Sequence, residues 1–288
     1  MNKFEFSFDQ PLRFCDFCKS NDIYHFMTDY KGISIYKCDS CGVLFMNPQY
    51  TDNHLEEFYN HQHERVIKHH RYGYSKRLKE IVHEFNIKQI ESYVSVGHFL
   101  SVGCGEGLDL KVAQKRGWIV EGYEVNKFFI EKISKQLNAK VRNGDFCKIS
   151  YDNCHYDCVY LNHVLEHTKN PGEYLRKIYN ILKRQGILYI ACPNIDSLSN
   201  RIKTFLEKIK VRKKIGKYYD TDKHLFYFNP FKLKNVLETY YSFKVISLGN
   251  DIKAGIRDKD VKVSFIDHYP YKSSFRLIAK KIDKVPYG

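Results

Sequence analysis

Apolar residues between positions 98 and 250 follow two alternating periods. Short apolar runs typical of strands occupy 98–102, 119–123, 156–161, 187–192 and 243–248. Between these runs, apolar residues recur every three or four positions, which predicts helices near 108–116, 127–137, 172–183 and 230–240. Repeated strand–helix units of this length need crossover connections between parallel strands. We therefore expect an α/β fold that is Rossmann-like and doubly wound, with a mostly parallel sheet and helices on both faces.

The pattern changes on either side of this region. The expected division is an aromatic-rich module at 1–50, a helical linker at 51–90, the α/β domain at 91–250 and a C-terminal extension at 251–288. The linker carries an apolar stripe at helical spacing, Leu78, Ile81, Val82 and Phe85. For the strand at 243–248 the extension offers two alternative antiparallel partners, Val261–Ile266 and Phe275–Lys280.

Composition narrows the class of protein. The 288 residues are 43% hydrophobic and 28% charged, and no run of eighteen apolar residues is present to span a bilayer. The first thirty residues carry charges throughout and lack the apolar core of a signal peptide, so we expect a cytoplasmic protein. The formal net charge of +14 favours a polyanionic partner, unless the lysines simply cover solvated faces.

Two cysteine pairs near the N-terminus have the spacing of a metal site. Cys15 and Cys18 form one C-x2-C pair, and Cys38 and Cys41 form a second one after nineteen intervening residues. Four thiolates in this arrangement are typical of a zinc ribbon. Such a Zn²⁺ ion is fully coordinated and would hold the fold together without taking part in catalysis. Free thiols, a relic site without metal and a redox pair are the alternatives.

The apolar run at 98–102 ends in three glycines at alternate positions, Gly103, Gly105 and Gly107. A strand that turns here into a helix presents unpaired backbone N–H groups, and glycine lets a ligand approach that backbone closely. The dinucleotide fingerprint is G-x-G-x-x-G, and Leu108 occupies its third glycine position. A nicotinamide site is therefore the less favoured interpretation.

Polar residues follow the next strands at suitable intervals. Glu124 comes at the expected end of the second strand, where a carboxylate can accept hydrogen bonds from both hydroxyls of a ribose. Asp145 offers an acceptor for an exocyclic amine, and Phe146 offers a flat apolar surface for a purine. The strand beginning at Tyr156 runs into Asn162 and His163 at its carboxyl end, the edge at which open α/β sheets bind ligands.

These four pieces, in this order, resemble the class I S-adenosylmethionine-dependent methyltransferases over about residues 72–250. The resemblance implies that the segment from Val102 through Gly103, Cys104 and Gly105 to Gly107 surrounds the methionyl end of S-adenosylmethionine. It also implies that Glu124 binds the ribose, that Asp145 and Phe146 hold the adenine, and that Asn162 contacts the cofactor. One position departs from the pattern: Ser101 stands where many relatives have an acid, which weakens the expected interaction with the cofactor's ammonium group unless water or a backbone carbonyl replaces it.

The triplet Leu165–His167 and the segment Leu182–Asn194 resemble the branch of this family that acts on quinones, small metabolites and sugars. Several bacterial members of that branch, linked to surface-glycan synthesis, also carry an N-terminal four-cysteine module. Methyl transfer to an alcohol or phenol needs a proton acceptor, and a histidine is the usual one. The candidates are His163, His167 and His224, with His163 first because it comes at the end of the strand beginning at Tyr156. The alternative role of His167 and Glu166 is a polar pair that fixes the start of the next helix.

A basic segment lies between the strand at 187–192 and the helix near 230–240. Its apolar residues at 198, 202, 205, 206 and 209 predict one helix face, and eight lysines and arginines against the single acid Glu207 contribute half of the net charge of the chain. The cations are Arg201, Lys203, Lys208, Lys210, Arg212, Lys213, Lys214 and Lys217. We expect a basic lid-like insertion at 195–223. Peripheral membrane contact through 198–217 and a merely solvated helix are the alternatives.

The sequence thus predicts a methyltransferase that uses S-adenosylmethionine, carries Zn²⁺ and methylates oxygen in a sugar, a glycan precursor or another small polar metabolite. Phosphorylated and lipid-linked acceptors fit the basic segment. One alternative is an enzyme that methylates ribosomal RNA, although the clustering of the cations makes a nucleic-acid partner less favoured. The other is a non-catalytic binding protein built on a methyltransferase scaffold.

Overall fold

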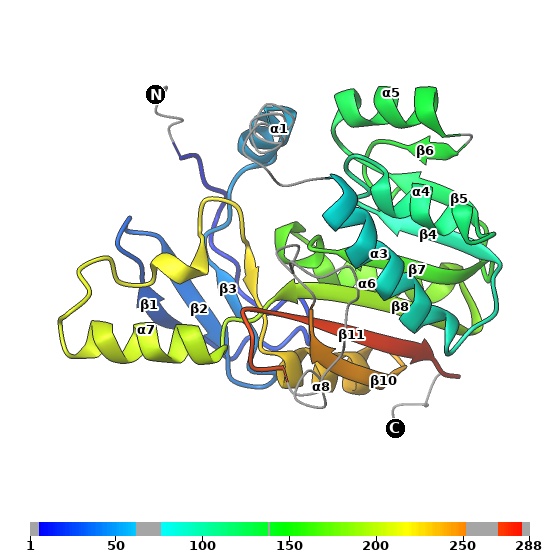
Figure 1. The fold of residues 1–288 in the computed structure, drawn as a ribbon. Coiled ribbons are helices and arrows are strands. Elements are labelled where there is room, and N and C mark those ends of the chain that lie inside the picture. Colours follow the sequence, from blue (N-terminus) through cyan, green and yellow to red (C-terminus); the bar gives the residue numbers. More distant parts are fainter. Residues whose placement is uncertain (1–5, 62–75, 138, 252–269, 284–288) are drawn as a thin grey trace.

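A seven-stranded sheet forms the centre of the molecule (Figure 1). The computed structural model describes residues 6–61, 76–137, 139–251 and 270–283. The strand order is β10-β11-β8-β7-β4-β5-β6. The strands, in chain order, are β4 (His98–Val102), β5 (Ile119–Tyr123), β6 (Lys140–Arg142), β7 (Tyr156–Asn162), β8 (Leu182–Pro193), β10 (Phe243–Asn250) and β11 (Ser274–Lys281).

Strands β6, β5, β4, β7 and β8 pair in parallel, whereas β11 pairs antiparallel with both β8 and β10. Five helices connect or flank these strands, namely α3 (Lys76–Glu91), α4 (Leu108–Lys115), α5 (Lys127–Gln136), α6 (Pro171–Ile181) and α8 (Pro230–Tyr240). The predicted Rossmann-like α/β fold is confirmed.

Alternate residues of the strands face two separate cores, which explains why helices cover both faces. In β4, Leu100 faces one core and Phe99 faces the other. The core of Leu100 includes residues of α6 and α8, and the core of Phe99 includes residues of α3, α4 and α5. Because both faces are buried, the strands read as nearly continuous apolar runs.

A second sheet joins the N-terminal module to a late part of the chain. Its order is β1 (Ile23–Thr28), β2 (Ser34–Cys38), β3 (Leu44–Met46) and β9 (Phe226–Tyr227). Phe17 packs edge-on against Phe226 with the ring centroids 5.5 Å apart, and the Tyr241 hydroxyl donates to the Phe17 carbonyl at 2.8 Å. The expected module at 1–50 therefore shares a sheet and a core with residues far along the chain.

The expected C-terminal extension contributes a strand to the main sheet. Of the two alternative partners for β10, the segment around Phe275–Lys280 is the one that pairs, as β11, with Lys280 opposite Lys244. The other alternative, Val261–Ile266, lies outside the described residues. Strand β11 lies between β10 and β8, so this part of the chain belongs to the α/β domain.

The basic segment contains α7 (Leu198–Lys208) and the short helix η2 (Lys217–Tyr219). Figure 1 shows α7 below β1 and β2, at the opposite end of the molecule from α5 and β6. The Tyr30 amide donates to the Ile215 carbonyl at 2.9 Å, which attaches this segment to the small sheet. Among the described helices, none has the length and apolarity needed to cross a bilayer.

Candidate functional site

The glycine loop at the end of β4 forms a tight turn into α4. Gly103, Gly105 and Gly107 have φ angles of 71°, 52° and 72°, a region that side chains rarely adopt. A Cβ on Gly103 would lie 2.6 Å from Val164 Cγ2, whereas around a Cβ on Gly105 no atom lies within 4 Å. The loop therefore needs glycine for its backbone, and at Gly105 it leaves open space for a ligand.

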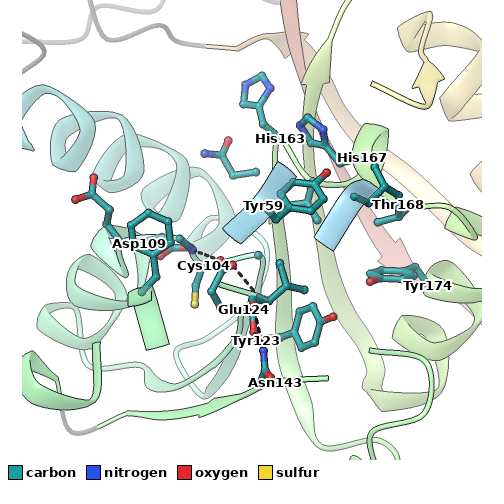
Figure 2. Close-up of a pocket in the computed structure, with 18 of the residues that line it drawn as sticks. Tyr59, Cys104, Asp109, Tyr123, Glu124, Asn143, His163, His167, Thr168 and Tyr174 are labelled. Carbon is teal, nitrogen blue, oxygen red and sulfur yellow. Dashed lines mark hydrogen bonds between the residues drawn. The ribbon is translucent and has the colours of Figure 1, made fainter. Parts of the chain in front are cut away.

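A pocket of about 1100 Å³ lies at the carboxyl ends of the parallel strands, beside this loop (Figure 2). Eight predicted site residues line it, namely Gly103, Cys104, Gly105, Glu124, Asp145, Asn162, His163 and His167. Four others do not line it, namely Val102, Gly107, Phe146 and His224. One cavity thus brings together the glycine loop, the acid after β5 and the polar end of β7.

Glu124 is buried, and backbone N–H groups hold its carboxylate. Oε2 accepts from the Gly105 amide at 2.7 Å, and Oε1 accepts from the amides of Val125 and Asn126, both at 2.9 Å. These bonds use three of about four acceptor positions. In this arrangement Oε2 keeps one further acceptor position, and the contact of this carboxylate with a ribose stays a prediction.

Phe146 lies behind the pocket wall. Its side chain is fully buried, and its ring centroid lies 4.7 Å from that of Tyr174 and 5.1 Å from that of Tyr123. The expectation that its ring faces a purine is therefore wrong, because two tyrosines separate it from the cavity. Asp145 does line the pocket, and its Oδ1 accepts from the Cys147 amide at 3.0 Å. Tyr123 and Tyr174 are the residues of this aromatic cluster that line the pocket.

Asp109, in the first turn of α4, is a site residue that the sequence interpretation missed. It is buried and lines the pocket, and Ser101 Oγ donates a hydrogen bond to its Oδ2. Within residues 6–61, 76–137, 139–251 and 270–283, Asp109 forms no ion pair with a lysine or arginine. Burial raises the pKa of its carboxyl. A buried carboxylate at a pocket wall without such a partner is suited to a cationic ligand.

His163 lines the pocket, but each of its two ring nitrogens lies within hydrogen-bonding distance of a carboxylate oxygen. Nδ1 lies 3.3 Å from Glu166 Oε1, and Nε2 lies 3.2 Å from Asp251 Oδ2. Burial lowers the pKa of His163, but the two hydrogen-bonded carboxylates outweigh this effect and raise it to about 10. The imidazole is therefore protonated at neutral pH, and no nitrogen is left to accept a proton. The first choice for the proton acceptor is not supported by this geometry.

His167 and His224 come close together beside Glu166. Their ring centroids are 4.9 Å apart, and His167 Nε2 lies 3.9 Å from Glu166 Oε1. His167 lines the pocket, whereas His224 lies behind it. Burial lowers the pKa of both histidines, that of His224 to about 4, so both imidazoles are neutral. The sequence hypothesis named both residues but gave no sign that the fold makes them neighbours.

The expected linker supplies one wall of the pocket. Helix α1 (Asp52–Asn60) contributes Tyr59, and α3 contributes His83. Figure 2 shows Tyr59 between Glu124 and the two histidines at the end of β7. The Asn126 side-chain amide donates to the Tyr59 carbonyl at 2.7 Å, which ties α1 to the strand that carries Glu124. The sequence signalled helices here, but not that their inner faces reach a ligand site.

The four predicted zinc ligands meet in the N-terminal module. The sulfur atoms of Cys15 and Cys41 are 3.6 Å apart, and those of Cys18 and Cys38 are 3.5 Å apart. A tetrahedral Zn²⁺ with Zn–S bonds of about 2.3 Å places its sulfur ligands about 3.8 Å apart. All four cysteines are free of disulfides, and Gly42 adopts the positive φ of 72° that the turn after the second pair needs. The donor set and its spacing therefore fit the ion.

The charges around the pocket are mostly negative, in contrast to the chain as a whole. The lining contains seven carboxylates, Asp52, Glu56, Glu106, Asp109, Glu124, Asp145 and Asp251, and three lysines, Lys79, Lys127 and Lys169. Lys169 pairs with Asp9 at 2.5 Å and Asp52 at 2.7 Å, and Lys79 with Glu106 at 3.4 Å. The excess of positive charge thus lies elsewhere on the surface, much of it in the basic segment.

A parallel α/β sheet with a glycine loop after its first strand, an acid after its second and a polar pocket at its carboxyl edge defines the class of nucleotide-cofactor enzymes to which the methyltransferases belong. A family model described as a methyltransferase domain matches residues 67–248, more than half of the chain. The chain belongs to this family of methyltransferase domains.

Curated and solved relatives agree with this assignment. A ubiquinone biosynthesis O-methyltransferase from Coxiella burnetii is 26% identical over 121 residues, which are 40% of this chain and 52% of that protein. The chain therefore spans about half the length of the curated relatives that it matches. An S-adenosylmethionine-dependent methyltransferase from Thermotoga maritima has a TM-score of 0.54 at 16% identity, covering 80% of this chain and 98% of the other. One from Archaeoglobus fulgidus has a TM-score of 0.50 at 20% identity, with 72% and 95% covered.

Proposed function

We propose that this enzyme methylates a hydroxyl oxygen of an uncharged small polar metabolite, such as a sugar or a glycan precursor. The observation that carries the proposal is the single cavity that joins the glycine loop to the histidine end of β7. When bound, S-adenosylmethionine supplies a methyl group on a positively charged sulfur and leaves as S-adenosylhomocysteine after the methyl–oxygen bond has formed. The weak similarity to a quinone O-methyltransferase supports oxygen as the acceptor atom.

Each part of the pocket has a role in this proposal. The Gly103–Gly107 loop lets the methionyl end approach its backbone, Glu124 accepts from the ribose, and Asp145 accepts from the adenine amine. Many relatives have an acid at the position of Ser101. In this chain Asp109, which accepts a hydrogen bond from Ser101, replaces that acid and binds the ammonium group of the cofactor. Tyr59 and His83 close the cavity on the helical side and exclude water from the reacting atoms.

The acceptor hydroxyl lies toward Glu166 and His167, at the end of β7. As the new bond forms, its proton leaves toward the cluster of Glu166, His167 and His224, whose neutral imidazoles have the protonation state required. His163 has a different role, because its charge balances the buried carboxylates of Glu166 and Asp251. It is a positioning residue for this wall of the pocket.

The charge of the pocket decides between acceptor classes. Phosphate groups are repelled by a lining that is rich in carboxylates, so an RNA substrate and a phosphorylated acceptor are both disfavoured. The basic segment does not offset this, since none of residues 195–223 lines the pocket. The alternative of a non-catalytic scaffold was based on the missing acid at Ser101. The carboxylate of Asp109 lies beside Ser101, so a carboxylate is not missing from this part of the pocket.

We also propose two partners outside the catalytic pocket. Cys15, Cys18, Cys38 and Cys41 bind a structural Zn²⁺, a role supported by their spacing and by the shared core around Phe17. The apolar face of α7 rests on an anionic membrane surface, because Leu198, Ile202, Phe205 and Ile209 are 51–61% exposed beside a row of cations. An enzyme held there would meet a lipid-linked acceptor whose reacting sugar is uncharged.

The test of the methylation proposal is transfer of a radiolabelled methyl group from S-adenosylmethionine to fractionated cell extract. We expect label in an uncharged small-molecule or lipid-linked sugar fraction, as an ether that resists mild alkali. The matched control is Glu124→Ala, which keeps the acceptor side of the pocket but loses an expected cofactor contact. Label in RNA would overturn the proposal in favour of RNA methylation. Cofactor binding without any labelled product would overturn it in favour of a scaffold.

A further inference from the structure

The histidine cluster at the end of β7 has the donor set of a second metal site. One ligand atom from each of Glu166, His167 and His224 lies within 4.8 Å of the other two. We propose that these three residues bind one divalent transition-metal ion, such as Zn²⁺, at the acceptor side of the pocket. The metal site stands on this geometry, and its part in the reaction rests on the function proposed above.

Hydrogen bonds fix the proton of each imidazole on the nitrogen that faces away from the cluster. His167 Nδ1 lies 2.8 Å from the Lys223 carbonyl, and His224 Nδ1 lies 3.2 Å from the Tyr219 carbonyl. A carbonyl can only accept, so each Nδ1 carries the hydrogen. A neutral imidazole has one such hydrogen, which leaves a lone pair on each Nε2. Two lone pairs and a buried carboxylate thus share a small volume, and a cation between them relieves the repulsion.

The surroundings resemble the outer shell of known metal sites. Histidine ligands usually donate their second N–H to a carbonyl or carboxylate, and carboxylate ligands are hydrogen-bonded in turn. Here Glu166 Oε2 accepts from Cys192 Sγ at 3.3 Å, and Oε1 is 3.3 Å from His163 Nδ1. The Leu225 amide donates to the Glu166 carbonyl at 2.8 Å, which fastens the loop bearing His224 to the turn bearing the other two ligands.

The donor set selects the kind of metal and leaves one coordination position open. Two imidazoles and a carboxylate suit zinc and other transition metals, whereas Mg²⁺ and Ca²⁺ prefer oxygen ligands. Three protein ligands leave a fourth position of a tetrahedral ion available. Of the three residues, His167 lines the pocket, and we expect the open position to face the cavity on its side. The four-cysteine site, in contrast, has no position left for a substrate.

A metal ion at this position changes how the acceptor is activated. The ion held by these residues would act as a Lewis acid and lower the pKa of an acceptor hydroxyl placed at its open position. The methyl–oxygen bond would form as the methyl–sulfur bond breaks, and the acceptor proton would leave to solvent outside the pocket. Glu166, His167 and His224 act as ligands in this scheme and neither gain nor lose a proton.

The test is the number of zinc ions bound per chain, measured by elemental analysis after equilibrium dialysis of the whole protein against Zn²⁺. We expect two ions in the wild type. Glu166→Gln and His224→Ala should each keep the ribbon ion and bind the second one more than about 100-fold more weakly. Cys38→Ser should keep the second ion and lose the first. The matched control is His155→Gln, since His155 also packs at a tilted angle against a histidine, His98, with ring centroids 4.2 Å apart, but belongs to neither site.

A folded wild type that binds only one ion, which Glu166→Gln and His224→Ala both retain, would overturn the metal proposal. Methyl transfer by such a one-zinc protein would leave the proposed function intact. A second ion that is lost in both ligand variants would support the metal site. If the same protein transferred no methyl group, the metal site would hold and the O-methyltransferase proposal would fail.

Discussion

The Ser101 hydroxyl donates a hydrogen bond to the Asp109 carboxylate, which joins the end of β4 to the first turn of α4. The two residues are eight positions apart in the chain, and both are buried. We propose that Asp109, on the following helix, replaces the carboxylate that many related methyltransferases carry at the position of Ser101. Because Ser101 itself does not line the pocket and Asp109 does, we assign the ammonium contact to Asp109.

Replacement of Asp109 by asparagine is expected to weaken S-adenosylmethionine binding about 10- to 100-fold, since a hydrogen bond to a charged group contributes about 1.5–3 kcal/mol. Isothermal titration calorimetry measures the change. Methylthioadenosine, which lacks the amino-acid part of the cofactor, should bind both proteins equally. The double variant Ser101→Asp, Asp109→Ser should recover most of the affinity. Equal losses for both ligands would show that Asp109 supports the fold of the pocket rather than the ammonium group.

The affinity for S-adenosylmethionine should rise with pH and then level off. Burial raises the pKa of Asp109, and a bound cation favours its charged form, so binding below that pKa releases a proton. Below the raised pKa the dissociation constant should increase by up to about tenfold for each pH unit. Titrations from the ordinary aspartate pKa of about 4 upward test this, with Asp109→Asn as the comparison. A slope that persists unchanged in Asp109→Asn would exclude this residue as its source.

Local patterns predicted most of the fold well, because the central strands β4, β7 and β8 are largely buried on both faces. The bounds of β4, β5 and α8 agree with the prediction to the residue. Strand β8 starts at Leu182, five positions before the expected Ile187, since Leu182 already pairs with Tyr156 before a register shift. Pairing of residues that precede the apolar run depends on the neighbouring strand, and the pattern of apolar residues does not predict it.

The site was predicted less completely, because several of its residues come from contacts across the chain. In the sequence, Asp109 is an ordinary acidic residue in the first turn of a helix. Only the fold shows that it lies beside Ser101. Asp251 follows the fifth predicted strand, but only the packing of β10 and β11 brings it to His163. Phe146 follows Asp145 directly, yet its ring turns into a cluster of tyrosines whose positions no local pattern reveals.

Loss of the ribbon ion should destabilise the whole protein and not only the N-terminal module. Cys15 and Phe17 belong to the same core as α6 and α8, and the Gly172 amide donates to Asp16 Oδ2 at 2.6 Å. Cys38→Ser is expected to lower the free energy of unfolding by at least about 3 kcal/mol. Thermal unfolding measures the effect, and Cys154→Ser, at an exposed cysteine, is the matched control. A separate early transition of the module, with the main one unchanged, would contradict this prediction.

The apolar stripe of α7 should decide membrane association. A solvated helix normally turns its apolar face inward, but Phe205 is 61% exposed and Ile202 is 53% exposed. Buried at a bilayer surface, each such side chain contributes about 1.5–3 kcal/mol at most. The cations of the same segment, including Lys208 and Lys210, add attraction to anionic headgroups. Apolar contact and charge therefore act together on one face.

The double variant Ile202→Ser, Phe205→Ser is expected to partition into phosphatidylglycerol vesicles at least about tenfold more weakly than the wild type. Sedimentation with the vesicles measures this. Ile119→Ser removes an equally exposed apolar residue from the start of β5, far from α7, and should change nothing. Added salt should weaken the wild type strongly, because the headgroup attraction is screened. If neither the double variant nor salt alters partitioning, the apolar stripe of α7 does not contact lipid and the membrane proposal is wrong.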